Sequence, residues 1–365
     1  MSFLDDLVRP ELADVRPYLP TQGDFRVRLD ANEAPGPLEP RLRERLASAF
    51  GELALERYPD ATAKKLREAV AERLGVEPNE LLMGVGSDEI LALLVTALAK
   101  PRRGSEPPIV LTTSPTFVMY KMSARLRGLR VIEVPLDASW DLAEEGMLRA
   151  LEIGPPHLVF IASPNNPTGT LMDRTRLERV IRAASRSLVV IDEAYIDYAT
   201  APGVGTVMKL ALDLPDVFVT RTFSKAYGMA GMRMGYAIGQ PETLRKLSNA
   251  WGLGDISELQ AVGGIAALAD QEHMAWEKQE NKRIRDYTTG EFQKMGFQVA
   301  DSQTNFIFVN IGRPAAGFRD ACRELGVAVG RDFPPMEKTW ARISLGRMED
   351  MEKAVPVFKR VLGKA

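Results

Sequence analysis

Lys225 is the residue of this sequence whose type and neighbours most directly suggest chemistry. A lysine amine forms a Schiff base with an aldehyde once its charge is suppressed. Hydroxyl groups precede it at Thr222 and Ser224, and a guanidinium follows at Arg233. This set predicts a site for an aldehyde cofactor that carries a phosphate. A solvated surface lysine is the alternative interpretation of so short a motif.

A glycine-rich loop at residues 84–89 runs directly into an apolar helical pattern. Its glycines allow the backbone to approach a ligand, and the N–H groups at Ser87 and Asp88 would face an anion at the start of the helix. The loop is therefore predicted to bind the cofactor phosphate together with the residues around Lys225. The simpler alternative is an ordinary helix cap at Ser87 or Asp88.

Two polar residues follow apolar strand patterns. Asn166 lies in a turn with prolines on either side, which would hold its amide in place to donate to a phenolate oxygen. Asp192 ends the next apolar run, and a buried acid requires a partner such as a protonated pyridine nitrogen. Together with Lys225, these residues point to pyridoxal 5′-phosphate (PLP). A structural turn and a magnesium-binding acid are the alternatives, and the sequence has no Walker A motif to support the latter.

Three more residues could complete such a site. Phe117 follows a strand pattern and could stack on a flat ring, although a core aromatic is an equal alternative. Arg331 and Arg342 near the end of the chain suit a carboxylate or phosphate, and surface ion pairs are their alternative.

Composition narrows the function classes. The chain has 365 residues, 45% hydrophobic and 26% charged, with a net charge of −2, as expected for a globular protein that binds neither nucleic acid nor membrane. Its single cysteine, Cys322, allows no internal disulfide and favours a cytoplasmic location. Its two histidines, His157 and His273, have no neighbouring ligands, so we expect no metal site. No signal-peptide pattern is present, and the longest apolar run, residues 90–99, is too short for a membrane span.

Apolar runs alternate with amphipathic segments between residues 81 and 238, which predicts an α/β fold whose mostly parallel sheet is flanked by helices. We expect strands at residues 109–112, 131–134, 158–162, 188–191, 217–220 and 236–238, and helices at 63–73, 88–99, 116–127, 177–185 and 241–251. Residues 41–257 would form this large domain. Residues 258–365 would form a smaller α+β domain, and residues 1–40 an arm associated with it. In the smaller domain we expect a long helical segment at 258–295, strands at 297–300, 306–309 and 341–344, and helices at 315–325 and 348–362.

The motifs together resemble the fold type I PLP-dependent aminotransferases of class I and II, and most of all the histidinol-phosphate aminotransferase group. The matching segments occur in family order over nearly the whole chain: residues 30–33, 57–60, 86–89, 115–117, 164–169, 192–195, 221–233, 304–306 and 342–344.

The resemblance implies a role for each matching residue. Lys225 would hold PLP and then move a proton between the substrate Cα and cofactor C4′. Asp192 would pair with the ring nitrogen, and Asn166 and Tyr195 would bond the ring oxygen. Phe117 would stack on the ring, while Ser87, Asp88, Thr222, Ser224 and Arg233 would hold the cofactor phosphate. Tyr58 would reach the phosphate of a partner subunit in a homodimer, and Arg342 with Arg331 would bind the substrate anion.

The expected reaction is amino transfer between histidinol phosphate or an amino acid and 2-oxoglutarate. The chain departs from its relatives at Val85, at residues 34–36 and at residues 251–257, and the last two segments line the substrate pocket in that family. An aromatic or broad-specificity aminotransferase and a lyase resembling threonine-phosphate decarboxylase therefore remain alternatives. A PLP-binding DNA regulator is disfavoured, because the chain has no basic extension.

Overall fold

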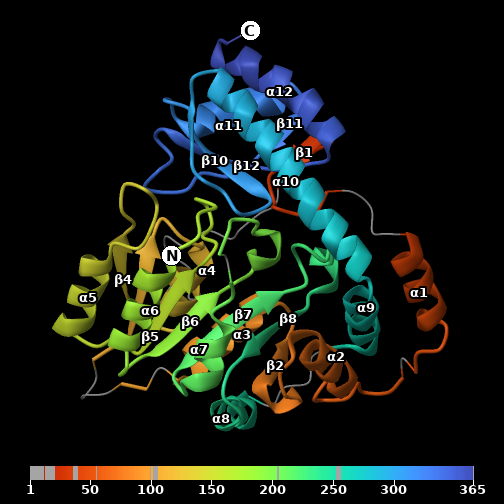
Figure 1. The fold of residues 1–365 in the computed structure, drawn as a ribbon, viewed down its shortest axis with the longest axis vertical. Coiled ribbons are helices and arrows are strands. Elements are labelled where there is room, and N and C mark those ends of the chain that lie inside the picture. The colour runs from red at the N-terminus through yellow and green to blue at the C-terminus, as the bar shows by residue number, and fades with distance from the viewer. Residues whose placement is uncertain are drawn as a thin grey trace, which may run out of the picture.

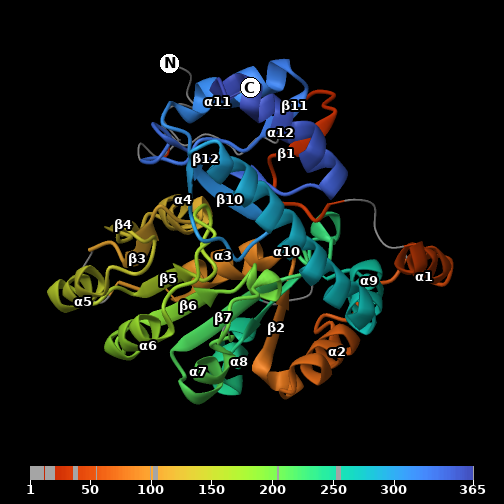
Figure 2. The ribbon, with the colours of Figure 1, turned by 45° about the horizontal axis from the view of Figure 1, so that its top comes forward.

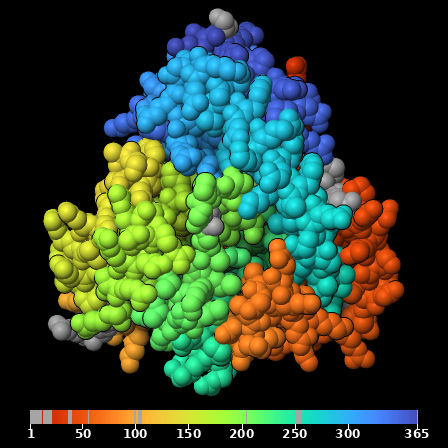
Figure 3. All heavy atoms as spheres, in the orientation of Figure 1, coloured from red at the N-terminus to blue at the C-terminus, as the bar shows by residue number. Residues whose placement is uncertain are grey.

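The structure is a computed structural model that describes residues 12, 21–35, 40–54, 56–98, 100–101, 106–203, 205–251 and 256–364. Its lower part in Figure 1 is built on a seven-stranded sheet, and a smaller body lies above that sheet. The smaller body, blue and cyan in Figure 3, is in direct contact with the yellow and green part of the chain below it.

The large sheet has the strand order β2-β8-β7-β6-β5-β3-β4. Strands β3, β4, β5, β6 and β7 are parallel to one another, whereas β8 is antiparallel to both β7 and β2. Every strand except β8 therefore points the same way. The bounds are β2 (Leu81–Gly84), β3 (Ile109–Ser114), β4 (Arg130–Pro135), β5 (Leu158–Ala162), β6 (Leu188–Asp192), β7 (Val217–Thr222) and β8 (Gly235–Ile238).

Helices cover both faces of this sheet because its central strands are apolar on both sides. On β6, Val189 and Ile191 belong to one hydrophobic core and Val190 to the other, as alternation along a strand requires. One face carries α3 (Ser87–Leu98), α4 (Val118–Leu126) and α8 (Pro241–Trp251). The other carries α2 (Lys64–Leu74), α5 (Glu144–Ile153), α6 (Arg174–Ala183), α7 (Met208–Asp213) and α9 (Glu258–Ala269), with α1 (Pro40–Phe50) against α9.

The smaller body has its own hydrophobic core. Its antiparallel sheet has the order β12-β10-β9, made of β9 (Gln298–Val299), β10 (Phe306–Asn310) and β12 (Trp340–Ser344). The helices α10 (Gln271–Lys294), α11 (Ala315–Glu324) and α12 (Met348–Leu362) pack around it. Strand β1 (Val27–Leu29) pairs in parallel with β11 (Val327–Val329), so segments from both ends of the chain lie side by side (Figure 2).

The predicted fold class is confirmed, and every predicted strand and helix in residues 63–251 and 297–362 is present with shifts at its ends. Three short strands (β1, β2 and β11) and three helices (α1, α5 and α7) were not predicted. The expected long helix of residues 258–295 is two helices, because Asp270 ends α9 and its carboxylate accepts the His273 N–H at 3.0 Å to cap α10.

The division into domains stays a prediction. The packing of α9 against α1 and α2, and of α10 in the smaller core, favours a boundary near Asp270 rather than at residue 258. Residues 1–11, 13–20 and 36–39 of the predicted arm lie outside the described residues. Within the described ranges no helix is both long and apolar enough to cross a membrane.

Candidate active site

The candidate site lies at the edge where the parallel strands end. The carboxyl ends of β2, β3, β5, β6 and β7 meet there, which is where open α/β sheets bind ligands. Register alignment sets Ala162 of β5 opposite Asp192 of β6, and Asp192 opposite Thr220 of β7. Asp192 at the end of β6 and the loops that carry Asn166 and Lys225 therefore lie at the same level of adjacent strands.

Lys225 lies three residues beyond the end of β7 and is half-buried. Its Nζ donates a hydrogen bond to the backbone oxygen of Asn32 at 3.2 Å and lies 5.5 Å from the centre of the Tyr195 ring. The amine is thus held between the segment after β1 and the loop after β6. An aldehyde that entered beside Tyr195 would meet it there.

Asp192 is the buried acid of the site. Its Oδ2 accepts from the Tyr120 hydroxyl at 2.7 Å, and its Oδ1 accepts from the Ala194 N–H at 3.1 Å. Burial raises the pKa of this carboxyl to about 6. Among the described residues it has no ion-pair partner. A protonated ring nitrogen would supply that missing positive charge, so Asp192 fits the base of a PLP site.

A narrow cavity leads to Asp192. It is walled by Phe117 and Tyr120 from the start of α4, by Asn166, and by Tyr195. Tyr120 lies edge-on to Phe117 with ring centres 5.6 Å apart and stacks on Phe160, which fixes the Phe117 wall. These aromatic walls and the Asp192 carboxylate would suit a flat ring that carries a protonated nitrogen.

The start of α3 lines one end of the cavity through Ser87 and could bind an anion there. The first N–H groups of a helix have no partner within the helix and attract an anion. Two glycines permit the packing here: a Cβ on Gly235 would lie 2.4 Å from the Ser87 nitrogen, and one on Gly86 would lie 2.8 Å from the Arg233 guanidinium. Arg233 also faces the Asp88 carboxylate at 3.6 Å.

The two predicted hydroxyls are adjacent to each other. Thr222 Oγ1 donates to Ser224 Oγ at 3.0 Å, and the Ser224 N–H donates back to Thr222 Oγ1 at 3.1 Å. Behind them, a buried ion pair joins Arg221 of β7 to Glu193, which follows β6, at 2.8 Å. This pair lies next in sequence to both Thr222 and Asp192 and stabilises the relative position of the two loops.

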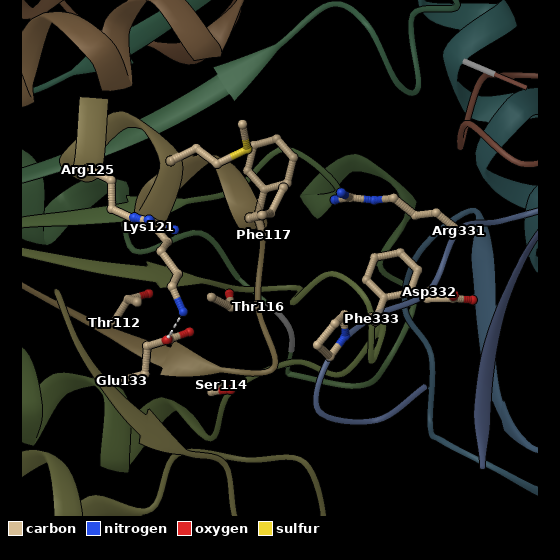
Figure 4. Close-up of a pocket in the computed structure, with 13 residues that line it drawn as sticks. Thr112, Ser114, Thr116, Phe117, Lys121, Arg125, Glu133, Arg331, Asp332 and Phe333 are labelled. Atoms are coloured by element: carbon tan, nitrogen blue, oxygen red, sulfur yellow. Dashed lines mark hydrogen bonds and ion pairs between the residues drawn. The ribbon is translucent and has the colours of Figure 1, made fainter. Parts of the chain in front are cut away.

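The predicted substrate arginines approach from the smaller body. Arg342 on β12 is buried, donating to Asn166 Oδ1 and to the Asp30 carbonyl at 2.9 Å each, and its guanidinium lies 4.7 Å from the Phe333 ring centre. In Figure 4, Arg331 extends toward Phe117 across a second pocket. Lys121 and Arg125 of α4 line the same pocket.

That second pocket carries a net positive charge, because Lys121, Arg125 and Arg331 line it together with only two acids, Glu133 and Asp332. Glu133 pairs with Lys121 at 2.5 Å, and Asp332 pairs with Arg319 at 2.7 Å. The cavity that contains Asp192 and the charged pocket share Phe117 as a wall.

The structure does not bring Tyr58 into this site. Its side chain is completely exposed on the surface.

Two neighbours of the site received no predicted role: Tyr120, which bonds Asp192, and Asn32, which bonds Lys225 and Tyr195. Tyr120 lies three residues after Phe117, so helical spacing could have indicated that the two share a face. The divergent residues Gly36 and 252–255 lie outside the described ranges.

Comparison with known proteins identifies the family of this chain. Residues 26–358 match the family of class I and II aminotransferases, and the chain belongs to that family. These enzymes use PLP to transfer an amino group between an amino donor and a 2-oxo acid, and the acid, amine and anion-binding end described above fit that cofactor.

Within the family, the chain is similar to histidinol-phosphate aminotransferases. It is 33% identical to that of Symbiobacterium thermophilum over 98% of this chain and 99% of the relative. It is 35% identical to that of Paracidovorax citrulli over 94% of each. The solved histidinol-phosphate aminotransferase of Sinorhizobium meliloti, in complex with PLP, is 26% identical, with a TM-score of 0.84 over 93% of this chain and 92% of that one.

Proposed function

We propose that this aminotransferase takes the amino group of histidinol phosphate and passes it to 2-oxoglutarate. The observation that carries the proposal is the positively charged pocket between Phe117 and Arg331, beside the cavity that contains Asp192. The named relatives support the same substrate. A phosphate monoester carries nearly two negative charges and is bound best by several cations.

The bound cofactor supplies an aldehyde and an electron-withdrawing ring. Lys225 would bond the aldehyde and move the proton from the substrate Cα, and Asp192 would keep the ring nitrogen protonated. Asn166 and Tyr195 would donate to the ring oxygen, and Phe117 would stack on the ring. The backbone N–H groups of Ser87 and Asp88, together with Thr222, Ser224 and Arg233, would hold the cofactor phosphate.

In this proposal the two arginines bind the substrate's anion. Arg342 is held rigidly by Asn166, Asp30 and Phe333 and is well placed for the carboxylate of 2-oxoglutarate. Arg331 and Arg125 are placed for a phosphate farther from the reacting atom. One site could thus accept two substrates with different anionic groups.

Histidinol phosphate should convert the bound cofactor faster than histidinol does. The two donors differ only in the phosphate, and one or two charge-assisted hydrogen bonds are worth about 1.5–3 kcal/mol each. We expect kcat/KM for the half-reaction to differ by about 10²-fold, measured from the absorbance change after rapid mixing. Phenylalanine and glutamate serve as comparison donors.

Faster conversion with phenylalanine than with histidinol phosphate would instead identify an aromatic aminotransferase. Release of CO2 from threonine phosphate, without formation of a keto acid, would identify a lyase. Equal rates with histidinol and histidinol phosphate would contradict the assignment of the charged pocket to a phosphate.

We also propose a cytoplasmic homodimer in which Tyr58 completes the partner's phosphate site. The full exposure of Tyr58 supports this, because its side chain is accessible to a second copy of the chain. The single cysteine, whose burial raises its pKa to about 12, supports a compartment where disulfides are not needed.

Mixed dimers test the shared site. In a dimer of a Lys225→Ala chain and a Tyr58→Phe chain, one site carries both changes and the other carries neither. Tyr58→Phe alone should weaken PLP binding about 10-fold, since a hydrogen bond to a charged group is worth about 1.5–3 kcal/mol. The mixed dimer should regain one site of wild-type affinity. A monomer by light scattering, or a mixture without a tight site, would contradict the proposal.

A further inference from the structure

Asn32 contacts several residues of the candidate site, although the sequence predicted no role for it. It follows β1, its side chain is buried, and its φ of 54° lies in the left-handed region that asparagine tolerates better than most residues. Its backbone oxygen accepts from Lys225 Nζ at 3.2 Å and from Asn305 Nδ2 at 3.0 Å. This conformation directs the carbonyl and the amide side chain to different neighbours.

The hydrogen bonds to Ser344 fix the orientation of the Asn32 amide. The Asn32 N–H donates to Ser344 Oγ at 2.9 Å, so that hydroxyl oxygen acts as an acceptor. The Ser344 hydroxyl then donates its own proton to Asn32 Oδ1 at 2.6 Å. Because Oδ1 is occupied, the amide must present its Nδ2 on the other side.

The amide nitrogen faces the Tyr195 hydroxyl at 3.1 Å. An NH₂ group can only donate, so the Tyr195 oxygen accepts from Asn32. A phenol that accepts from one neighbour keeps its single proton for another acceptor. Tyr195 lines the cavity that leads to Asp192, where that proton would face the bound cofactor.

We infer that Asn32 is a positioning residue that makes Tyr195 a proton donor toward the cofactor, while its carbonyl holds the Lys225 amine. The inference rests on the proposed role of Tyr195 at the ring oxygen. It also makes that role depend on β12, because Ser344 belongs to the smaller body and Tyr195 to the larger one. The smaller body therefore helps to set the hydrogen bonding of the cofactor ring.

Asn32→Asp is the sharpest test because it preserves shape and replaces a donor by an acceptor. The Tyr195 proton would turn to the new carboxylate, and the cofactor ring oxygen would lose a donor. The measurement is the pH midpoint of the cofactor absorbance in the loaded protein, together with the PLP dissociation constant. We expect the midpoint to rise by about one pH unit or more.

The new charge alone would also raise the midpoint, so the same change is made in a Tyr195→Phe background. A double-mutant cycle separates the two effects. The inference requires the shift from Asn32→Asp to be clearly smaller without the Tyr195 hydroxyl. An equal shift in both backgrounds would overturn it. If Tyr195→Phe leaves the midpoint of the wild-type protein unchanged, the proposed role of Tyr195 fails, and the inference fails with it.

Two uncharged variants cover the case in which Asn32→Asp does not fold. Ser344→Ala frees the amide to rotate, and Asn32→Gly removes it while tolerating the positive φ and keeping the carbonyl for Lys225. Each should raise the midpoint in the same direction by a smaller amount, and thermal unfolding of the cofactor-free protein checks folding. Wild-type midpoints in both folded variants would overturn the inference.

Discussion

Replacing Lys225 with alanine should abolish turnover and covalent attachment of the cofactor together. The amine that approaches Tyr195 and Asn32 is the group available at this site both to bond the aldehyde and to carry the Cα proton. General acid–base catalysis alone contributes about 10²–10⁴-fold, so the loss with two roles removed should be at least about 10⁴-fold. Single-turnover rates measure the loss, and borohydride reduction followed by mass spectrometry locates the attachment.

Lys209→Ala provides a matched control. Lys209 is an exposed lysine on α7 that pairs with Asp213, and its loss should leave the rate unchanged. A small primary amine in solution should partly restore turnover to the Lys225→Ala protein, because it can replace the missing base but not the tether. Turnover retained without added amine would contradict the assignment of Lys225.

Asp192→Asn should lower activity while it stabilises the cofactor-free protein. If the cofactor binds as proposed, the change would remove the negative charge opposite the ring nitrogen, and breaking a buried pair costs about 3–5 kcal/mol. We therefore expect kcat to fall about 10²- to 10³-fold. Tyr120→Phe, which removes only the 2.7 Å hydrogen bond to Asp192, should cause a smaller loss.

In the cofactor-free protein, Asp192→Asn should increase the free energy of unfolding instead of removing a favourable ion pair. Burial raises the Asp192 pKa from 3.8 to about 6, so the folded protein binds this proton more tightly than the unfolded chain does. Wild-type stability should then fall as the pH rises from about 4 to about 6, by up to about 3 kcal/mol. Asp192→Asn should lack this loss and unfold at a higher temperature above pH 6, with no advantage below pH 4. If the stability of the two cofactor-free proteins depended on pH in the same way, Asp192 could not be a buried acid without an ion-pair partner.

The central sheet and the position of the site could be predicted because the signals are local. Apolar runs mark β5, β6 and β7, and parallel strands bring their carboxyl ends to one edge, so Asn166, Asp192 and Lys225 had to converge. The three-residue strands β1 and β11 have no such signal, since three residues carry too little pattern. The unpredicted strand β2 merges with the glycine-rich loop that follows it.

The hydrogen bonds around the site were beyond sequence reasoning for a different reason. The motif that contains Asn32 could be recognised, but its partners Tyr195, Asn305 and Ser344 lie 163, 273 and 312 residues away. No spacing rule connects residues so far apart. The direction in which each group donates is set by the three-dimensional arrangement of donors and acceptors alone.

The pairing of β1 with β11 has a consequence for how the chain is made. Val27 pairs opposite Val327, so β1 cannot meet its partner strand until the chain has been synthesised through β11. The large sheet can form earlier, since its last strand ends at Ile238. The segment after β1 carries Asn32. We therefore expect the contacts of Asn32 with Lys225 and Ser344 to form late, when the smaller body folds.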